Sequence, residues 1–199
     1  MKQNEITTNL LNYYNDKFAQ FGQTPQGVDW NSKLAQEKRF EMLLEIIRDK
    51  EPFSLNDLGC GYGALYHYIK RRLMPMTSYY GYDVSTKMAV AADMPVIVAD
   101  HVALDADYSV CSGIFHVKLD TPKRDWEAYI TKAILSMYQN SHKGFAFNGL
   151  TDKVDFKKDH LYYSSPWLWA SRLTTLSNLE IKVLEDYGLH DWTILCWKI

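Results

Sequence analysis

From Phe53 to the C-terminus, short apolar segments alternate with amphipathic ones, and this alternation limits the possible folds more than any other feature. Strands that alternate with helices form a parallel sheet with helices on both faces. In chain order, the expected strands are FSLNDLG, SYYGYDV, PVIVAD, DYSVCSG and GFAFNGL. The expected helices cover residues 64–72, 85–92, 122–140 and 165–176.

The chain ends with two further strand-like segments, NLEIKVLED and DWTILCWKI, joined by the short connection YGLH. Two consecutive strands with so short a connection pair antiparallel, because a parallel pair needs a long crossover. The sequence therefore predicts an α/β protein with seven strands, of which the last two form an antiparallel pair.

The N-terminal part is expected to be helical. Residues 5–21 carry apolar side chains at helical spacing, the segment GQTPQGVDWN breaks the pattern, and residues 33–49 resume it. We expect a single domain, residues 1–199, in which a helical cover (residues 1–50) precedes the sheet-containing core (residues 51–199). Within it, residues 1–32 are expected to form a mobile cover over the cofactor with a hinge at residues 22–30, and permanent packing on the sheet is the alternative.

Composition excludes several classes of protein. The net charge of −2 argues against a general binder of nucleic acids or membrane surfaces, which usually has a basic excess. No apolar segment approaches the length of a membrane span, and the N-terminus lacks the apolar core of a signal peptide. The three cysteines are far apart and show no zinc spacing. We expect a cytoplasmic protein without a metal site and leave its oligomeric state open.

A glycine-rich loop joins the first expected strand to the first helix of the core, in the sequence NDLGCGYGA. Bare glycine lets a ligand approach the backbone, and a helix N-terminus attracts a negative group. The same residues also match the dinucleotide-binding pattern G-x-G-x-x-A. Asp83, at the end of the second strand, can accept hydrogen bonds from both ribose hydroxyls, which suits NAD and S-adenosylmethionine equally.

Three side chains favour the second ligand. Tyr62 is bulky where a pyrophosphate would meet the loop. Asp57 can meet a ligand ammonium group and would repel a phosphate. Asp100, directly after the third strand, can accept a hydrogen bond from an adenine amino group. A ligand with an amino-acid tail, a ribose and an adenine accounts for all three acids.

The segments LNDLGCGYG, YYGYDVS, VADHVAL and ADYSVCSGIF resemble, in order, successive motifs of the class I S-adenosylmethionine-dependent methyltransferases. The resemblance covers about residues 53–120. It implies a Rossmann-like, doubly wound seven-stranded sheet, mostly parallel with an antiparallel last strand, and S-adenosyl-L-homocysteine as the product. The implied cofactor-binding residues are Asp57, Gly59, Cys60, Gly61, Asp83, Val84, Ser85, Asp100, His101 and Ser112.

Residues that follow the fourth strand are expected to face the methyl acceptor. His116 is the candidate general base, because imidazole accepts a proton near neutral pH, and a structural, hydrogen-bonded role for it stays open. Phe115 would shape the sulfonium side of the site. Trp30, Tyr14 and Asn148 are the further candidates for acceptor contacts.

The leading functional hypothesis is methyl transfer from S-adenosylmethionine to an oxygen or nitrogen of a small-molecule or sugar acceptor. The similarity to small free-standing bacterial methyltransferases suggests this acceptor class. The alternatives are a nicotinamide-dependent oxidoreductase of the same fold and a non-catalytic module that binds S-adenosylmethionine. The sequence does not name the acceptor.

Overall fold

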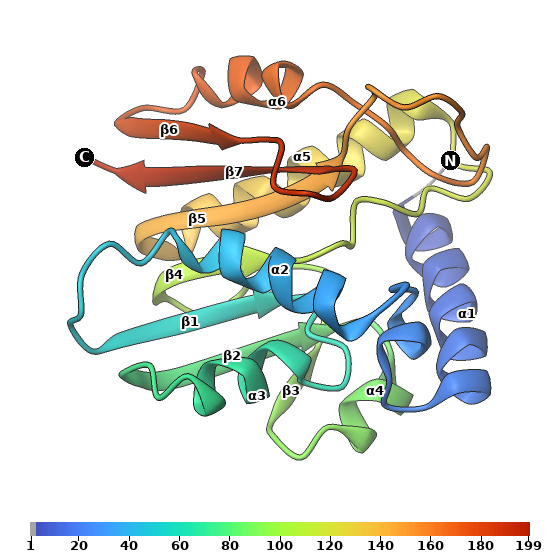
Figure 1. Cartoon of the computed structure of the whole chain (residues 1–199), viewed down its shortest axis with the longest axis horizontal. Helices are drawn as coiled ribbons and strands as arrows, with labels where there is room; N and C mark the ends of the chain where they lie inside the picture. The colour runs from blue at the N-terminus through green and yellow to red at the C-terminus, as the bar shows by residue number, and fades with distance from the viewer. Residues whose placement is uncertain (1–2) are drawn as a thin grey trace.

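A computed structural model describes residues 3–199 and shows a seven-stranded sheet between two layers of helices (Figure 1). The sheet order is β3-β2-β1-β4-β5-β7-β6. Strands β1 to β5 pair in parallel, and β7 is antiparallel to both β5 and β6, as predicted. The strands are β1 Phe53–Leu58, β2 Met76–Asp83, β3 Val96–Val98, β4 Ala106–Cys111, β5 Ser141–Leu150, β6 Leu179–Leu184 and β7 Asp191–Lys198.

The helices divide between the two faces of the sheet. Apolar side chains of α2 and α3 pack on one face, and those of α5 and α6 pack on the other. The helical elements are α1 Gln3–Phe21, the 3₁₀ turn η1 Pro25–Val28, α2 Lys33–Leu44, α3 Ala64–Arg71, α4 Thr86–Ala91, α5 Lys123–Gln139 and α6 Pro166–Leu173. Among the described residues, no helix is long and apolar enough to cross a membrane.

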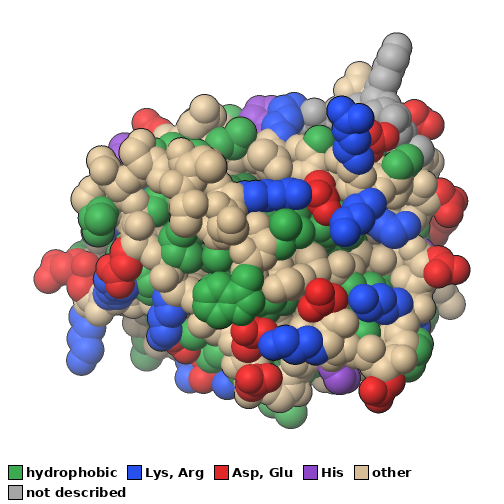
Figure 2. All heavy atoms as spheres, turned by 90° about the horizontal axis from the view of Figure 1, so that it is seen from above, with side chains coloured by type: hydrophobic (Ala, Val, Ile, Leu, Met, Phe, Trp, Pro, Cys, Tyr) green, Lys and Arg blue, Asp and Glu red, His purple; other side chains and the backbone are tan. Residues whose placement is uncertain are grey.

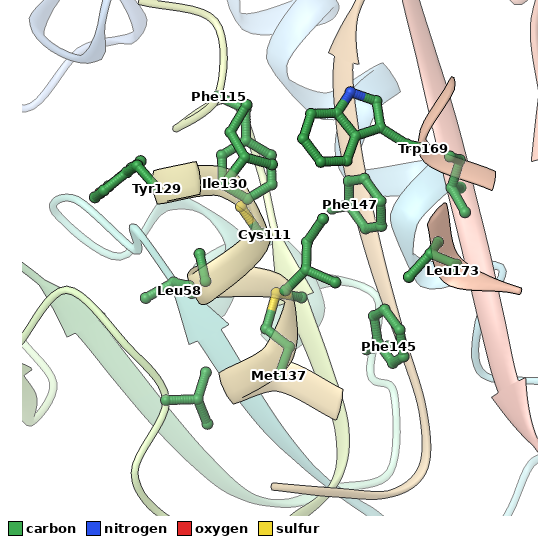
Figure 3. Packing of buried hydrophobic residues seen from close by; sticks show 14 of the residues in the cluster. Leu58, Cys111, Phe115, Tyr129, Ile130, Met137, Phe145, Phe147, Trp169 and Leu173 are labelled. Atoms are coloured by element: carbon green, nitrogen blue, oxygen red, sulfur yellow. The ribbon is translucent and has the colours of Figure 1, made fainter. Parts of the chain in front are cut away.

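The hydrophobic core has two halves, one on each face of the sheet, because side chains alternate between the faces along each strand. Successive residues of a strand point to opposite faces, so Leu55 joins the cluster under α2 and α3 whereas Leu58 joins the cluster under α5 and α6. Figure 3 shows the second cluster, in which rings from β5 meet side chains of α5 and α6. The central strands β1, β4 and β5 are buried along most of their length, which fits a position between two layers of helices.

Two segments differ from the expectation. The helix expected over residues 33–49 ends at Leu44. Ile46 and Ile47 donate instead to the carbonyls three residues earlier, so the last turn tightens and buries Ile46. The break at residues 22–31 contains η1, which Thr24 caps by accepting from the Gly27 amide.

The carboxyl ends of the parallel strands form the edge that matters for function. The order of the strands reverses between β1 and β4, and ligands bind at such a switch point in open α/β sheets. Because β7 runs antiparallel, its first residue, Asp191, reaches the same edge. Helix α1 lies on the side of the molecule toward which the parallel strands point (Figure 1).

Candidate functional site

A cavity of about 450 Å³ lies at this edge. Its walls come from the β1–α3 loop, the ends of β2 and β3, the β4–α5 loop, helices α1, α2 and α5, the segment around η1, and the loop before α6. The volume falls within the range of sites for cofactors and drug-sized ligands, about 300–1,000 Å³.

The glycine loop adopts a conformation that explains its sequence. Gly59 and Gly61 have φ values of 79° and 56°, in the left-handed region that favours glycine. The Gly59 and Cys60 amides both donate to the Tyr82 carbonyl, at 2.7 and 2.9 Å, and this fixes the loop to the end of β2. The loop therefore presents bare backbone to the cavity in a fixed position.

Two carboxyl groups flank the loop. Asp57 is buried at the end of β1 and accepts a hydrogen bond from the Tyr79 hydroxyl. Burial raises the pKa of Asp57 to about 7, although the bond from Tyr79 acts in the opposite direction and the Asp83 charge adds to the rise. Asp83 accepts from the Gly61 amide at 2.9 Å and from the Ser85 amide at 2.8 Å. Burial raises the pKa of Asp83 as well, and these backbone bonds limit the rise.

Three buried side-chain polar atoms in the described part of the chain lack a hydrogen-bond partner, and all three belong to this region. They are Ser112 Oγ, His116 Nε2 and Asn148 Nδ2. Ser112 and His116 line the cavity, and Asn148 accepts from the Gly113 amide in the same loop. Because buried polar groups in native proteins are nearly always hydrogen-bonded, unpaired atoms at a cavity indicate a ligand site.

The far side of the cavity is built around Trp30. The Arg39 guanidinium lies over the Trp30 ring, 4.1 Å from its centroid, and the His116 ring meets Trp30 edge-on at 5.3 Å. Gly113 makes this arrangement possible, because a Cβ atom there would lie 2.3 Å from the Trp30 ring.

Arg39 in turn binds Asp191. Its Nε and Nη2 atoms donate to the two carboxylate oxygens, at 3.2 and 2.5 Å, and both side chains are buried. His116 Nε2 lies 3.3 Å from Asp191 Oδ1, out of line for a hydrogen bond. Burial lowers the pKa of His116 to about 4, the Asp191 charge opposes this, and the Arg39 charge adds to it. His116 is therefore neutral at physiological pH.

Helix α1 attaches to the rim through polar and apolar contacts. Tyr13 donates to Asp29 at 2.7 Å, and Lys17 pairs with the same carboxylate at 2.7 Å. Burial raises the pKa of Tyr13, and the hydrogen bond to Asp29 contributes to the rise. Ile6 and Leu10 are buried in the core cluster under α5 and α6. The helix thus packs on the sheet domain and also closes one side of the cavity.

Most of the side chains expected from the sequence line this cavity. They are Asp57, Gly59, Cys60, Gly61, Asp83, Val84, Asp100 and Ser112 on the glycine-loop side, and Tyr14, Trp30 and His116 on the other. Among the described residues, no group of three or more His, Cys, Asp or Glu side chains is placed to hold a metal ion.

The structure removes four expected contacts from the cavity wall. Phe115 turns into the core, where its ring meets Phe147 (Figure 3). Ser85 is buried as the N-cap of α4 and donates to Asn15. His101 is exposed beside Asp100, and Asn148 lies behind the β4–α5 loop, where it accepts from Gly113.

Arg39, which lines the cavity, and its buried partner Asp191 are two residues that the sequence analysis missed. Arg39 lies in the amphipathic helix that follows the break at residues 22–31. No local sequence pattern distinguishes it from the other polar residues of that helix. Asp191 carried a usable signal, since it opens the last strand of an antiparallel pair and must therefore lie at the edge where the parallel strands end.

Comparisons with known proteins found a relative by sequence and several solved structures with a similar fold. No protein-family model matches the chain. Protein Rv1506c of Mycobacterium tuberculosis (strain ATCC 25618 / H37Rv), whose name provisionally assigns it to the methyltransferases, is 39% identical over 165 residues, which cover 78% of this chain and 99% of the relative.

Solved structures share the whole architecture. Magnesium protoporphyrin IX methyltransferase (ChlM) from Synechocystis PCC 6803 with bound SAM has a TM-score of 0.67 at 13% identity, with 97% of both chains covered. The DhpI–SAH complex has a TM-score of 0.65 at 16% identity and covers 99% of this chain and 98% of its own. Human N-acetylserotonin methyltransferase with SAM has a TM-score of 0.66 at 12% identity, over all of this chain and 60% of its own.

Proposed function

The chain belongs to the class I S-adenosylmethionine-dependent methyltransferases, and we propose that it methylates an oxygen or nitrogen atom of a small-molecule or sugar acceptor. One observation carries the proposal: a single cavity joins the glycine loop and its acids to the Trp30–His116 side. Donor and acceptor need such a shared, enclosed space, because methyl transfer requires their alignment and the exclusion of water. The nicotinamide alternative from the sequence loses its support, since the relative and the similar structures are methyltransferases.

The residues of the glycine-loop side suit S-adenosylmethionine. Asp57 and the Gly59 backbone would hold the methionine end, Asp83 the ribose and Asp100 the adenine edge. The unpaired, buried Ser112 Oγ supports a ligand at this place. When bound, S-adenosylmethionine supplies a methyl group that its sulfonium centre activates.

The acceptor would bind on the side of Trp30 and His116. His116 is neutral, so its imidazole has a lone pair for the proton that a hydroxyl or amine acceptor gives up. Trp30 and Tyr14 provide aromatic surface for the acceptor. Lys and Arg side chains are interspersed with Asp and Glu on the face seen in Figure 2. The net charge of −2 favours a small acceptor over a nucleic acid.

The pKa of Asp57 predicts a pH-dependent affinity for the cofactor. Below about pH 7 the carboxyl group is protonated, and it must lose its proton before it can pair with a ligand ammonium. We expect affinity for S-adenosylhomocysteine to level off above about pH 8 and to fall by up to about tenfold per pH unit below pH 7. Calorimetric titration from pH 5.5 to 8.5 measures this dependence.

The matched variants for this prediction are Tyr79→Phe and Asp57→Asn. Loss of the Tyr79 hydroxyl removes a bond that lowers the pKa of Asp57, so the fall should begin at a higher pH in Tyr79→Phe. Asp57→Asn should bind more weakly and without the pH dependence. An equal pH dependence in Asp57→Asn would show that another group is responsible.

We further propose that residues 1–32 act as a cover that opens for ligand exchange, because α1 contributes Leu10, Tyr13, Tyr14 and Lys17 to the cavity wall. Hydrogen exchange should show that S-adenosylhomocysteine slows exchange of the α1 amides more than that of the α5 amides. Exchange in α1 that is already as slow as in α5 without ligand, and that ligand leaves unchanged, would show that the helix is a fixed part of the core.

Turnover against a panel of hydroxyl, carboxyl, amine and sugar compounds tests the acceptor class. The expected result is S-adenosylhomocysteine release that depends on one compound class. Release with a macromolecule from a cell extract and with no compound of the panel would contradict a small acceptor. Cofactor binding without turnover on any acceptor would favour the non-catalytic alternative.

A further inference from the structure

We propose that Asp191, held by Arg39, is a positioning residue that orients His116 with Nε2 toward the carboxylate and Nδ1 toward the methyl acceptor. This inference rests on the proposed role of His116 as the base that meets the acceptor. It assigns a role to a buried ion pair that connects α2 to β7, 152 residues apart in the sequence.

The position of Asp191 follows from strand direction. Leu150, the last residue of β5, pairs with Asp191, the first residue of β7. Along the same face of these strands the apolar pair Ala146 and Leu195 is followed by the polar pair Asn148 and Thr193. The sheet face therefore changes from apolar to polar as it approaches the cavity, and Asp191 stands at the end of this polar section.

Arg39 fixes the carboxylate from one side. Two of its nitrogens donate to the two oxygens of Asp191, and its Nη1 donates to the Ala35 carbonyl at 2.9 Å. Trp30 covers the guanidinium plane. A bidentate pair held by a further hydrogen bond and an aromatic ring has one orientation, so Asp191 Oδ1 is presented to His116 in a constant direction.

His116 is confined between this carboxylate and Trp30. The Trp30 ring meets the imidazole at an interplanar angle of 85°, and Nε2 lies 3.3 Å from Asp191 Oδ1. The contact is short but misaligned. Catalytic hydrogen bonds are often long or poorly aligned without substrate and align when the complex forms. A small rotation of the imidazole would complete a bond from Nε2–H to Asp191.

That bond would leave Nδ1 as the nitrogen with a free lone pair. The charges that face His116 come from Asp191 on β7, Arg39 on α2 and Asp29 after η1. Asp29 is paired with Lys17 and Tyr13. Arg39 balances the charge of Asp191, so the carboxylate orients the ring and does not hold it in the protonated form.

A purely structural role, in which the ion pair only joins α2 to β7, is the competing explanation. The tautomer of His116 distinguishes the two roles, and it can be measured without a methyl acceptor. The ¹⁵N chemical shifts of histidine-labelled protein report which ring nitrogen carries the proton, and His116→Gln identifies the signal. We expect the Nε2–H form to dominate in the wild type with S-adenosylhomocysteine bound. A dominant Nδ1–H form would overturn the proposal.

A double variant then tests the source of this preference. Arg39→Met with Asp191→Leu replaces the ion pair by apolar side chains, an exchange that often preserves stability. We expect the Nε2–H preference of His116 to weaken toward that of free histidine, while affinity for S-adenosylhomocysteine stays within about threefold of the wild type. An unchanged preference in the folded double variant would overturn the proposal.

The matched control is Arg48→Gln. Arg48 forms a bidentate ion pair with Glu180 and covers the ring of Trp197, near the opposite end of β7 from Asp191. This variant should keep the wild-type tautomer. A dominant Nδ1–H form in the wild type would overturn the proposal even if the double variant does not fold. Absence of S-adenosylhomocysteine binding in the wild type would contradict the proposed function. That outcome is distinct from an unexpected tautomer, which would contradict the role of Asp191.

Discussion

Replacement of Asp191 by alanine is expected to lower the free energy of unfolding by about 3–5 kcal/mol, because it leaves the Arg39 guanidinium buried without its partner. The carboxylate of Asp191 is fully buried, and the two side chains connect α2 to the last strand of the sheet. Urea unfolding of the wild type and the variant, followed by circular dichroism, measures the difference.

The exposed ion pair of Arg48 and Glu180 is the control, since it has the same bidentate form. Glu180→Ala should leave the unfolding midpoint close to that of the wild type, because water and salt screen an exposed pair. Equal losses in Asp191→Ala and Glu180→Ala would contradict the burial argument. Asp191→Ala should also be less stable than the apolar double variant, which leaves no charge unpaired.

Replacement of Asp83 by alanine is expected to weaken binding of S-adenosylmethionine by about 1.5–3 kcal/mol, the range for hydrogen bonds to a charged group. This corresponds to at least about a tenfold rise in the dissociation constant. Asp83 lines the cavity at the end of β2 and also accepts from the Gly61 amide, so its loss would remove the proposed ribose contact and a bond that holds the loop. Calorimetric titration measures the change.

Asp107→Ala is the matched control for Asp83→Ala. Asp107 lies near the start of β4, away from the carboxyl edge, where it accepts from the Ser54 amide and hydroxyl. Its replacement should leave the dissociation constant unchanged. A folded Asp83→Ala protein with wild-type affinity would remove Asp83 from the cofactor site.

The glycine-loop side of the cavity could be predicted from the sequence because its residues are close in sequence. Asp57, Gly59 and Gly61 lie in one strand–loop–helix unit, and Asp83 ends the next strand, so sequence order alone places them together. The same locality explains why the strand count and the antiparallel end of the sheet were predicted correctly.

The Trp30–His116 side of the cavity could not be predicted in full, because it is assembled from distant segments. Arg39, His116 and Asp191 come from α2, the β4–α5 loop and β7, and their contacts depend on the packing of the whole sheet. Phe115 shows the same limit: it is next to His116 in sequence, yet the backbone directs its side chain into the core. Trp30 was predicted at the cavity from the break in the helical pattern, and the structure places it there.

Calorimetric titration of the wild-type protein with S-adenosylhomocysteine, with NAD as the parallel ligand, tests the central claim most directly. The account predicts saturable binding of one S-adenosylhomocysteine per chain at pH 7.5 and no heat of binding with NAD. Saturable binding of NAD without a response to S-adenosylhomocysteine would contradict it.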